Sequence, residues 1–259
     1  KDERRQYVKY IQESSHNMLS LVNSLLDWTR LQTGRIKFKP IKTDLSKIVD
    51  KAVNSVAGFA MQKEISILNK ISNEIFAFID GDLIFQAVNN LFSNALKFTN
   101  AGGSVTINVA QSKESRFFEV TVSDTGVGIP QENISKIFEV DSKITTEGTK
   151  GEKGTGLGLS LVREIVEKHG GKIWVESEKG KGAAFKFLLP KASATILFID
   201  DSNTDRILYS KIIKSILPEY EVITAESGNR GLELVMELSP ALIISDHTMP
   251  EMTGYEFVT

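Results

Sequence analysis

The chain contains no cysteine and no long apolar run, and its charges nearly balance. Without cysteine among its 259 residues it can form neither disulfides nor thiolate metal sites, which agrees with a reducing cytoplasm. No window is apolar enough for a membrane span, and no signal peptide opens the chain. With Lys+Arg 31 against Asp+Glu 33, the net charge of −2 gives no electrostatic basis for binding nucleic acid or an anionic membrane. The composition therefore predicts a soluble cytoplasmic protein, long enough for one large or two ordinary domains.

Residues 1–35 carry the hydrophobic pattern of a heptad repeat. From Met18 to Trp28 the flanking positions are apolar as well, so the stripe is wider than one partner helix can cover. We therefore expect one long helix, ended by Gly34 as a C-terminal cap, that joins a bundle formed between chains. The alternative is a lone amphipathic helix lying on its own domain. The seam positions are Val8, Ile11, Ser15, Met18, Val22, Leu25, Thr29 and Gln32.

Residues 36–190 mix helical and strand patterns, which predicts an α+β domain in which helices cover one sheet. Asp82 is placed to cap the second helix, and the polar segment Asp141–Lys153 is typical of a mobile loop. The expected helices are Leu45–Phe59, Leu83–Thr99, Ile134–Phe138 and Leu157–Lys168. The expected strands are Ser66–Ile71, Ile75–Ile79, Ser104–Ala110, Phe117–Ser123, Lys172–Ser177 and Ala183–Leu189.

After a short polar linker at residues 191–194, strand and helix patterns alternate strictly through residues 195–259. Such alternation is typical of a doubly wound parallel sheet. Three strands with two helices would leave a sheet edge bare, so we expect only the N-terminal half of a domain. The expected elements are Thr195–Ile199, Asp205–Leu217, Glu221–Thr224, Gly228–Leu238 and Ala241–Ser245.

The segment N-N-L-F-S-N-A-L-K-F-T (Asn89–Thr99) places oxygen ligands and a cation on one helix face. Asn90 and Asn94 are four residues apart, with Lys97 and Phe98 on the next turn. Amide oxygens suit Mg²⁺, a lysine ammonium suits phosphate, and a phenyl ring offers an apolar wall for a base. Taken alone, the segment fits equally well a helix with solvated amides.

Two glycine-bearing segments follow, and each could contact a nucleotide. In D-T-G-V-G-I (Asp124–Ile129), Gly126 and Gly128 permit close backbone approach, and the carboxylate of Asp124 could accept a hydrogen bond from an adenine amine. A tight turn capped by aspartate would have the same composition. G-T-G-L-G-L (Gly154–Leu159) enters a helix directly, so its N–H groups could face phosphate, although alone it could be a hinge.

As an ordered set, these segments resemble the sensor histidine kinases, whose catalytic domain carries an asparagine box, two glycine boxes and an intervening phenylalanine in this order. The resemblance covers residues 1–190 and implies a Bergerat-type ATP-binding α/β sandwich that binds ATP and Mg²⁺. The residues that it assigns to the site are Asn90, Asn94, Lys97, Phe98, Asp124, Gly126, Gly128, Phe138, Lys153, Gly154, Thr155, Gly156, Leu157 and Gly158.

The resemblance also implies a role for several of these residues. Asn94 would ligate Mg²⁺, and Asp124 would bind the adenine amine. Asp141–Lys153 would form the ATP lid. Asn90 and Lys97 would act in catalysis, which in this family consists of positioning and charge neutralisation.

Ser14–Phe38 is similar to the second helix of the family's dimerisation and phosphotransfer hairpin, which implies a homodimer through a helix bundle. His16 is not expected to be the phosphoacceptor. The family's acceptor lies on the first hairpin helix and precedes an acidic residue, whereas Asn17 follows His16. We therefore expect this chain to bind Mg·ATP but not to autophosphorylate. His169 is expected to complete a helix C-terminus, where a cation is favourable.

Three acidic residues end strands in the C-terminal segment. Asp200 and Asp201 follow its first strand, and Asp246 follows its third. The carboxyl ends of parallel strands meet at one edge of a sheet, so these carboxylates should cluster. Clustered carboxylates repel each other unless a cation such as Mg²⁺ lies among them. Helix capping by Asp201 and a turn at Asp246 would explain each residue separately, but not why all three end strands on the same side.

The segments F-I-D-D-S (Phe198–Ser202) and S-D-H-T-M-P-E-M-T-G (Ser245–Gly254) resemble the receiver domains of response regulators. The resemblance implies that the acidic pair, Asp246 and the carbonyl of Thr248 hold a metal, and that Asp246 also accepts a phosphoryl group. The family's switch hydroxyl and phosphate-binding lysine belong to later strands, which this sequence does not contain.

Together the two resemblances imply a hybrid histidine kinase that passes a phosphoryl group from ATP to a bundle histidine and on to Asp246. The expected partners are a second copy of the chain and a downstream response regulator or phosphotransfer protein, without nucleic acid or membrane contact from this segment. The alternatives are a non-catalytic kinase-like scaffold and an ATPase of the same fold superfamily that drives dimer closure.

Overall fold

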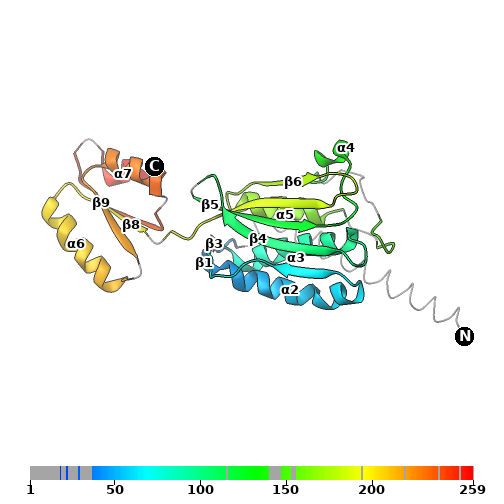
Figure 1. Cartoon of the computed structure of the whole chain (residues 1–259). Helices are drawn as coiled ribbons and strands as arrows, with labels where there is room; N and C mark the ends of the chain where they lie inside the picture. The colour runs from blue at the N-terminus through cyan, green and yellow to red at the C-terminus, as the bar shows by residue number, and fades with distance from the viewer. Residues whose placement is uncertain are drawn as a thin grey trace, which may run out of the picture. The chain divides into compact units, whose positions relative to one another are not determined.

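The computed structural model of the chain separates into two compact units, Lys1–Pro190 and Lys191–Thr259 (Figure 1). His16, Gly34 and most of the heptad positions lie outside the described residues. The heptad positions Met18, Val22 and Thr29 are described and are helical. In the described part, no helix combines the length and the apolar character needed to cross a membrane. The described residues are these three and 37–114, 116–139, 147–152, 156–193, 195–218, 220–238, 240–250 and 252–258.

The first unit is a five-stranded sheet in the order β2-β4-β5-β7-β6, next to a two-stranded sheet of β1 and β3. Strands β2 and β4 are parallel, and the other neighbours are antiparallel. The strands are β1 (Ile41–Asp44), β2 (Ser66–Asn69), β3 (Phe76–Ile79), β4 (Ser104–Gln111), β5 (Phe117–Asp124), β6 (Ile173–Ser177) and β7 (Ala183–Pro190). The helices are α2 (Leu45–Gln62), α3 (Gly81–Phe98), α4 (Gln131–Ile134) and α5 (Gly158–Lys168).

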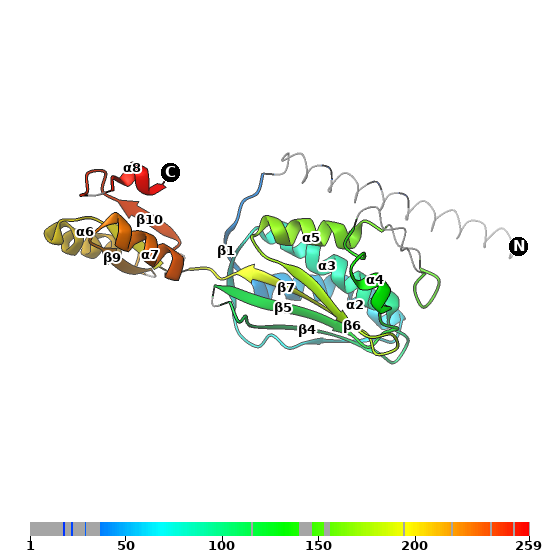
Figure 2. The same ribbon diagram turned by 90° about the horizontal axis from the view of Figure 1, so that it is seen from above.

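Helices α2, α3 and α5 cover one face of the larger sheet, which gives a two-layer sandwich (Figure 2). The alternation of the strands explains this arrangement, because every second residue of β4, β5 and β7 points into the same core. Phe187 of β7 and Phe92 of α3 are fully buried there. Truncation of such a phenylalanine to alanine typically costs about 3–5 kcal/mol. The predicted α+β sandwich is thus confirmed.

Aspartates begin the two long helices. Asp44 caps α2 by accepting from the amide of Ser46 (3.0 Å), and Asp80 caps α3 by accepting from the amide of Leu83 (3.3 Å). The prediction that Asp82 caps this helix is wrong. Asp82 lies inside the first turn, where its charge still favours the positive end of the helix dipole.

The histidine at the end of α5 is buried and bonded through both ring nitrogens. Nε2 of His169 accepts from the amide of Asp80 (2.9 Å), and Nδ1 lies 2.7 Å from the carbonyl oxygen of Ile165. The neutral tautomer with its proton on Nδ1 satisfies both bonds. Burial lowers the pKa of His169, although the Ile165 carbonyl and the Asp80 charge oppose the shift. His169 therefore ends the helix as predicted, but as a neutral ring rather than a cation.

One further local prediction differs from the structure. The short helix expected at Ile134–Phe138 instead occupies Gln131–Ile134, because Pro130 is its N-cap and fixes the backbone one turn earlier. Isolated turns follow it up to Glu139. Within the expected mobile loop, Glu147–Glu152 is tied by hydrogen bonds to the end of α3.

The second unit is a parallel sheet in the order β10-β8-β9, with α6 and α7 on opposite sides of β8 and β9 (Figure 1). Its core includes Leu197 and Ile199 of β8 and Leu234 of α7. This arrangement confirms the predicted doubly wound pattern. The elements are β8 (Thr195–Ile199), α6 (Asn203–Ile216), β9 (Glu221–Ala225), α7 (Gly228–Leu238), β10 (Leu242–Ser245) and α8 (Gly254–Val258).

Candidate functional site

The C-terminal half of α3 presents two half-buried asparagines. Nδ2 of Asn90 donates to the carbonyl of Gln86 (3.0 Å), and its Oδ1 lies beside Gly158 at the start of α5. A Cβ at Gly158 would lie only 3.1 Å from that oxygen. The side-chain amide of Asn94 makes no hydrogen bond with any described residue. Its oxygen can therefore serve as a ligand for a hard cation such as Mg²⁺.

Lys97 and Phe98 lie at the end of the same helix. The ammonium of Lys97 is 4.6 Å from the centre of the Phe98 ring, a cation–π distance. Burial lowers the pKa of Lys97, the nearby charge of Lys63 lowers it further, and Glu152 and Glu147 oppose the shift. A half-buried ammonium surrounded by other charges gives this helix end a cation that can bind phosphate.

Asp124 is the last residue of β5, and only one of its two carboxylate oxygens accepts hydrogen bonds from described residues. Its Oδ1 accepts from the amides of Gly126 (2.8 Å) and Ala183 (3.3 Å), whereas its Oδ2 has no hydrogen-bond partner among the described residues. Burial raises the pKa of the Asp124 carboxyl, and these two backbone bonds partly offset the rise. The backbone thus fixes the carboxylate and leaves one oxygen to accept a hydrogen bond from a ligand amine.

The loop after Asp124 is joined to the end of α3. The amide of Val127 donates to the carbonyl of Phe98 (3.1 Å). A Cβ at Gly126 would collide with that same carbonyl oxygen, so only glycine allows the two backbones to approach this closely. Gly128 has a φ of +68°, which also favours glycine. The asparagine segment and the first glycine segment therefore form one continuous surface.

Helix α5 begins beside this surface without a side-chain cap. Leu157 is its N-cap residue, and the apolar side chain of Leu157 makes no cap hydrogen bond to the first amides of the helix. Uncapped N–H groups at a helix N-terminus form a natural binding site for phosphate. Gly156 and Gly158 flank this N-cap residue, and Gly156 has a φ of +74°. Three residues of the predicted site, Lys153, Gly154 and Thr155, lie outside the described residues.

The three acidic residues of the second unit cluster at the carboxyl ends of β8 and β10. One carboxylate oxygen from each of Asp200, Asp201 and Asp246 lies within 4.8 Å of the others. The amide of Asp246 donates to Ile199 (2.8 Å), which aligns the two strand ends. All-oxygen ligands at this spacing suit Mg²⁺. Thr248, the fourth predicted ligand, is exposed in the loop after Asp246.

Two features of α6 position this acidic cluster. Ser202, not Asp201, caps the helix by accepting from the amide of Asp205 (3.3 Å). The guanidinium of Arg206 donates to the carbonyls of Asp200 (2.6 Å) and Asp201 (3.0 Å). The carboxylate of Asp201 is therefore not needed for capping, and both acidic residues are held through their backbone.

Two family models match the chain. Residues 79–193 match the histidine kinase-, DNA gyrase B- and HSP90-like ATPase family, and residues 196–259 match the response regulator receiver domain. The circadian input-output histidine kinase CikA of Synechococcus elongatus is 32% identical over an alignment covering 97% of this chain. The sensor histidine kinase TmoS of Ectopseudomonas mendocina is 29% identical over 94% of it. This chain belongs to the hybrid sensor histidine kinases.

Among solved structures, the hybrid-kinase chain is similar to full-length ShkA in complex with AMPPNP. The two share 25% identity and a TM-score of 0.61, over 96% of this chain and 54% of ShkA. The alignments with TmoS and CikA cover 29% and 35% of those proteins, so the chain spans about a third of their length. The ATPase match lies almost entirely within the first unit, and the receiver match lies within the second.

Phe138, which the resemblance assigns to the nucleotide site of a histidine kinase, packs against the core. Its ring meets the ring of Phe185 edge-on, with centroids 6.3 Å apart. The half-buried side chain fastens the segment after α4 to β7. In the described structure Phe138 thus supports the sheet next to the site.

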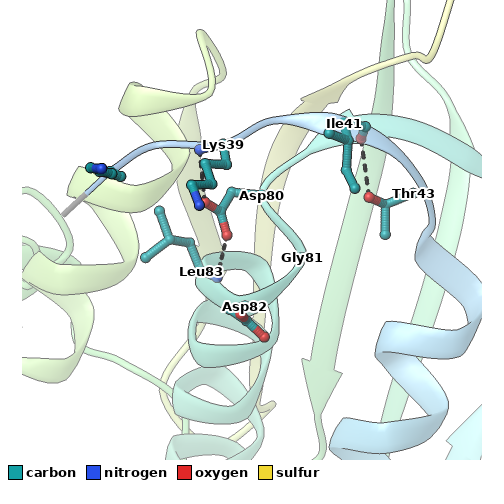
Figure 3. A pocket seen from close by; sticks show the side chains of 8 residues that line it. Lys39, Ile41, Thr43, Asp80, Gly81, Asp82 and Leu83 are labelled. Atoms are coloured by element: carbon teal, nitrogen blue, oxygen red, sulfur yellow. Dashed lines mark hydrogen bonds between the residues drawn. The ribbon is translucent and has the colours of Figure 1, made fainter.

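A cavity of about 510 Å³ lies at the other end of α3 (Figure 3). The segment Lys37–Thr43 forms one side, and Asp80–Leu83 forms the other. The carboxylate of Asp80 accepts hydrogen bonds there from the amides of Lys39 (3.0 Å) and Leu83. Because a helix rises about 1.5 Å per residue, this cavity is roughly 20 Å from Lys97. It is therefore separate from the candidate nucleotide site of the kinase.

Proposed function

We propose that this chain binds Mg·ATP as the nucleotide-binding part of a protein-histidine kinase. In the proposed reaction the γ-phosphoryl group moves from ATP to an imidazole nitrogen of a bundle histidine, leaving ADP. It then moves to a carboxylate oxygen of Asp246, which restores the histidine. ATP as the donor places this reaction in the cytoplasm. The expected partners are a second copy through the helix bundle and a downstream regulator or phosphotransfer protein.

The main support is the convergence of three segments at one end of α3. The hydrogen bond from Val127 to Phe98 joins the asparagine segment to the first glycine loop, and Gly158 brings α5 against Asn90. This surface combines an acceptor oxygen on Asp124, an amide oxygen, a lysine ammonium and uncapped helix amides. These groups match the adenine amine, the cation and the phosphates of Mg·ATP.

Each residue would act mainly by positioning. Mg²⁺, held by Asn94 and the phosphates, neutralises phosphate charge when it is bound. Lys97 and the amides at the start of α5 hold phosphate oxygens, and Asp124 fixes the base by its amine. Asn90 is fixed by its bond to Gln86 and keeps α3 aligned with α5. Phosphoryl transfer depends largely on such alignment and charge stabilisation.

In the receiver unit, Asp200 and Asp201 would hold Mg²⁺ together with the Thr248 carbonyl, and Asp246 would be the nucleophile. Carboxylates within 4.8 Å of one another repel unless a cation lies among them, which is the basis of this assignment. The cation would also draw phosphate oxygens towards Asp246.

Photolabelling with an azido-ATP in the presence of Mg²⁺ tests the nucleotide site. We expect labelled peptides from Asn89–Thr99 or Asp124–Ile129, with labelling competed by ATP. With γ-labelled ATP, we expect the chain to acquire no phosphohistidine. Labelling that ATP does not compete would instead favour the non-catalytic scaffold, and phosphohistidine at His16 would contradict the assignment of the acceptor to another helix.

A further inference from the structure

A fully engaged lysine lies beneath the candidate site. Lys63 is only 1% exposed and follows the last residue of α2. Its ammonium donates to the carbonyls of Leu96 (2.7 Å) and Lys97 (2.8 Å) and to Oε1 of Glu152 (2.8 Å). These bonds use all its donors, and the two carbonyls belong to the negative end of the α3 dipole. Lysine is rarely buried without such partners.

The carboxylate of Glu152 joins Lys63 to the loop Glu147–Glu152. One oxygen accepts from Lys63, and the other accepts from the amide of Lys150 (2.8 Å). Burial alone would raise the pKa of Glu152, but the bonds from Lys63 and the Lys150 amide lower it below the usual value. Glu152 therefore stays ionised and holds the loop closed on itself.

The same loop packs directly on Lys97. The amide of Thr149 donates to the Lys97 carbonyl (3.0 Å), and its hydroxyl donates to the carbonyl of Thr99 (3.1 Å). A Cβ at Gly148 would lie 2.6 Å from Cγ of Lys97 and would collide with Glu152. Only glycine therefore lets the loop lie this close to the stem of Lys97.

We propose that Lys63 and Glu152 are positioning residues for nucleotide phosphate. They hold the loop Glu147–Glu152 against the end of α3, and the loop in turn fixes the side chain of Lys97. Glu152 also directly precedes Lys153 and the second glycine segment in the sequence. Phosphate affinity thus depends on an ion pair that acts through Lys97. This inference rests on the proposed nucleotide site.

Glu152→Gln tests the inference because it keeps the size of the side chain and removes its charge. We expect the affinity of the full chain for Mg·ATP to fall about tenfold, with the affinity for adenosine changed less than twofold. Adenosine has no phosphate, so a general loss of structure would weaken both ligands alike. Glu167→Gln is the matched control, because the Arg163–Glu167 pair is exposed on α5 (2.7 Å) and should leave both affinities unchanged.

A double-mutant cycle with Lys97→Met tests whether Glu152 acts through Lys97. In the Lys97→Met background, adding Glu152→Gln should cause no further loss of ATP affinity. Lys63→Arg, which keeps the charge, should retain more ATP affinity than Lys63→Met. If Lys63→Met does not fold, the Glu152→Gln measurements alone decide whether the ion pair supports phosphate affinity through Lys97.

Three outcomes would overturn the inference. They are unchanged ATP affinity in folded Glu152→Gln, equal losses for ATP and adenosine, and additive losses in the cycle. If the parent chain itself does not bind nucleotide, the proposed function is overturned together with this inference. Binding by the parent that is lost in Asp124→Asn but unchanged in Glu152→Gln would overturn this inference alone.

Discussion

The substitution Asp124→Asn replaces one hydrogen-bond acceptor, a carboxylate oxygen, by a donor, an NH₂ group, while it preserves the shape of the side chain. In the folded protein, Oδ1 of Asp124 accepts from the amides of Gly126 and Ala183. The oxygen of asparagine can keep both bonds, which places its NH₂ group at the position of the open Oδ2. A donor would then face the amine of adenine, where an acceptor is needed.

The size of the effect follows from the type of bond that is lost. A hydrogen bond to a charged group contributes about 1.5–3 kcal/mol. ATP affinity should therefore fall about 10- to 150-fold, at roughly 1.4 kcal/mol per factor of ten. The fold should be retained, because the half-buried charge is removed and both backbone bonds remain. Inosine triphosphate carries an oxygen in place of the amine, so the variant should bind it relatively better than the parent does.

Calorimetric titration of parent and Asp124→Asn with ATP and with inosine triphosphate, both with Mg²⁺, measures this preference directly. We expect the ratio of the ATP to the inosine triphosphate affinity to fall in the variant. ATP binding at the parental affinity would refute the assignment of Asp124 to the adenine amine. An equal loss for both nucleotides would refute it too, because base recognition would then not depend on this oxygen.

Three further predictions concern a glycine substitution, the pH dependence of stability and the binding of Mg²⁺. Gly126→Ala should lose about 1–3 kcal/mol of unfolding free energy together with ATP binding, because its Cβ would collide with the Phe98 carbonyl; unchanged thermal denaturation would contradict this. Urea unfolding of the parent should show stability falling as pH drops below 6.5, by up to about 1.4 kcal/mol per pH unit. Below this pH the imidazole of His169 binds a proton in the unfolded chain, whereas burial in the folded chain opposes its protonation. His169→Gln should therefore remove this slope. Mg²⁺ at a hundredfold excess over its Kd should stabilise the receiver unit by about 2.7 kcal/mol, and Asp200→Asn should abolish the thermal shift.

The segments of the candidate nucleotide site could be located from sequence because their chemistry is local. Asn90 and Asn94 share a helix face through their four-residue spacing, and the glycines of the first loop mark close backbone approach. The acids at the ends of β8 and β10 could be predicted to cluster from the rule for parallel strands, and one oxygen from each lies within 4.8 Å of the others.

Other features depended on tertiary contacts that no local pattern records. Lys63 and Glu152 are 89 residues apart, and neither stands in a recognisable motif. Asp80 and Asp82 both flank Gly81, and only the backbone geometry shows which of them caps α3. His169 could be placed at a helix end from sequence, but its neutral state follows from burial against the Asp80 amide.

The proposed nucleotide site is built from three distant segments, and nuclear magnetic resonance can observe each of them in one titration. On addition of Mg·ATP, we expect signals from the Asn94 side chain and the Gly126 and Gly158 amides to shift together. All three should give the same dissociation constant. Shifts in only one segment, or different dissociation constants for the three, would contradict a single nucleotide site formed by all three segments.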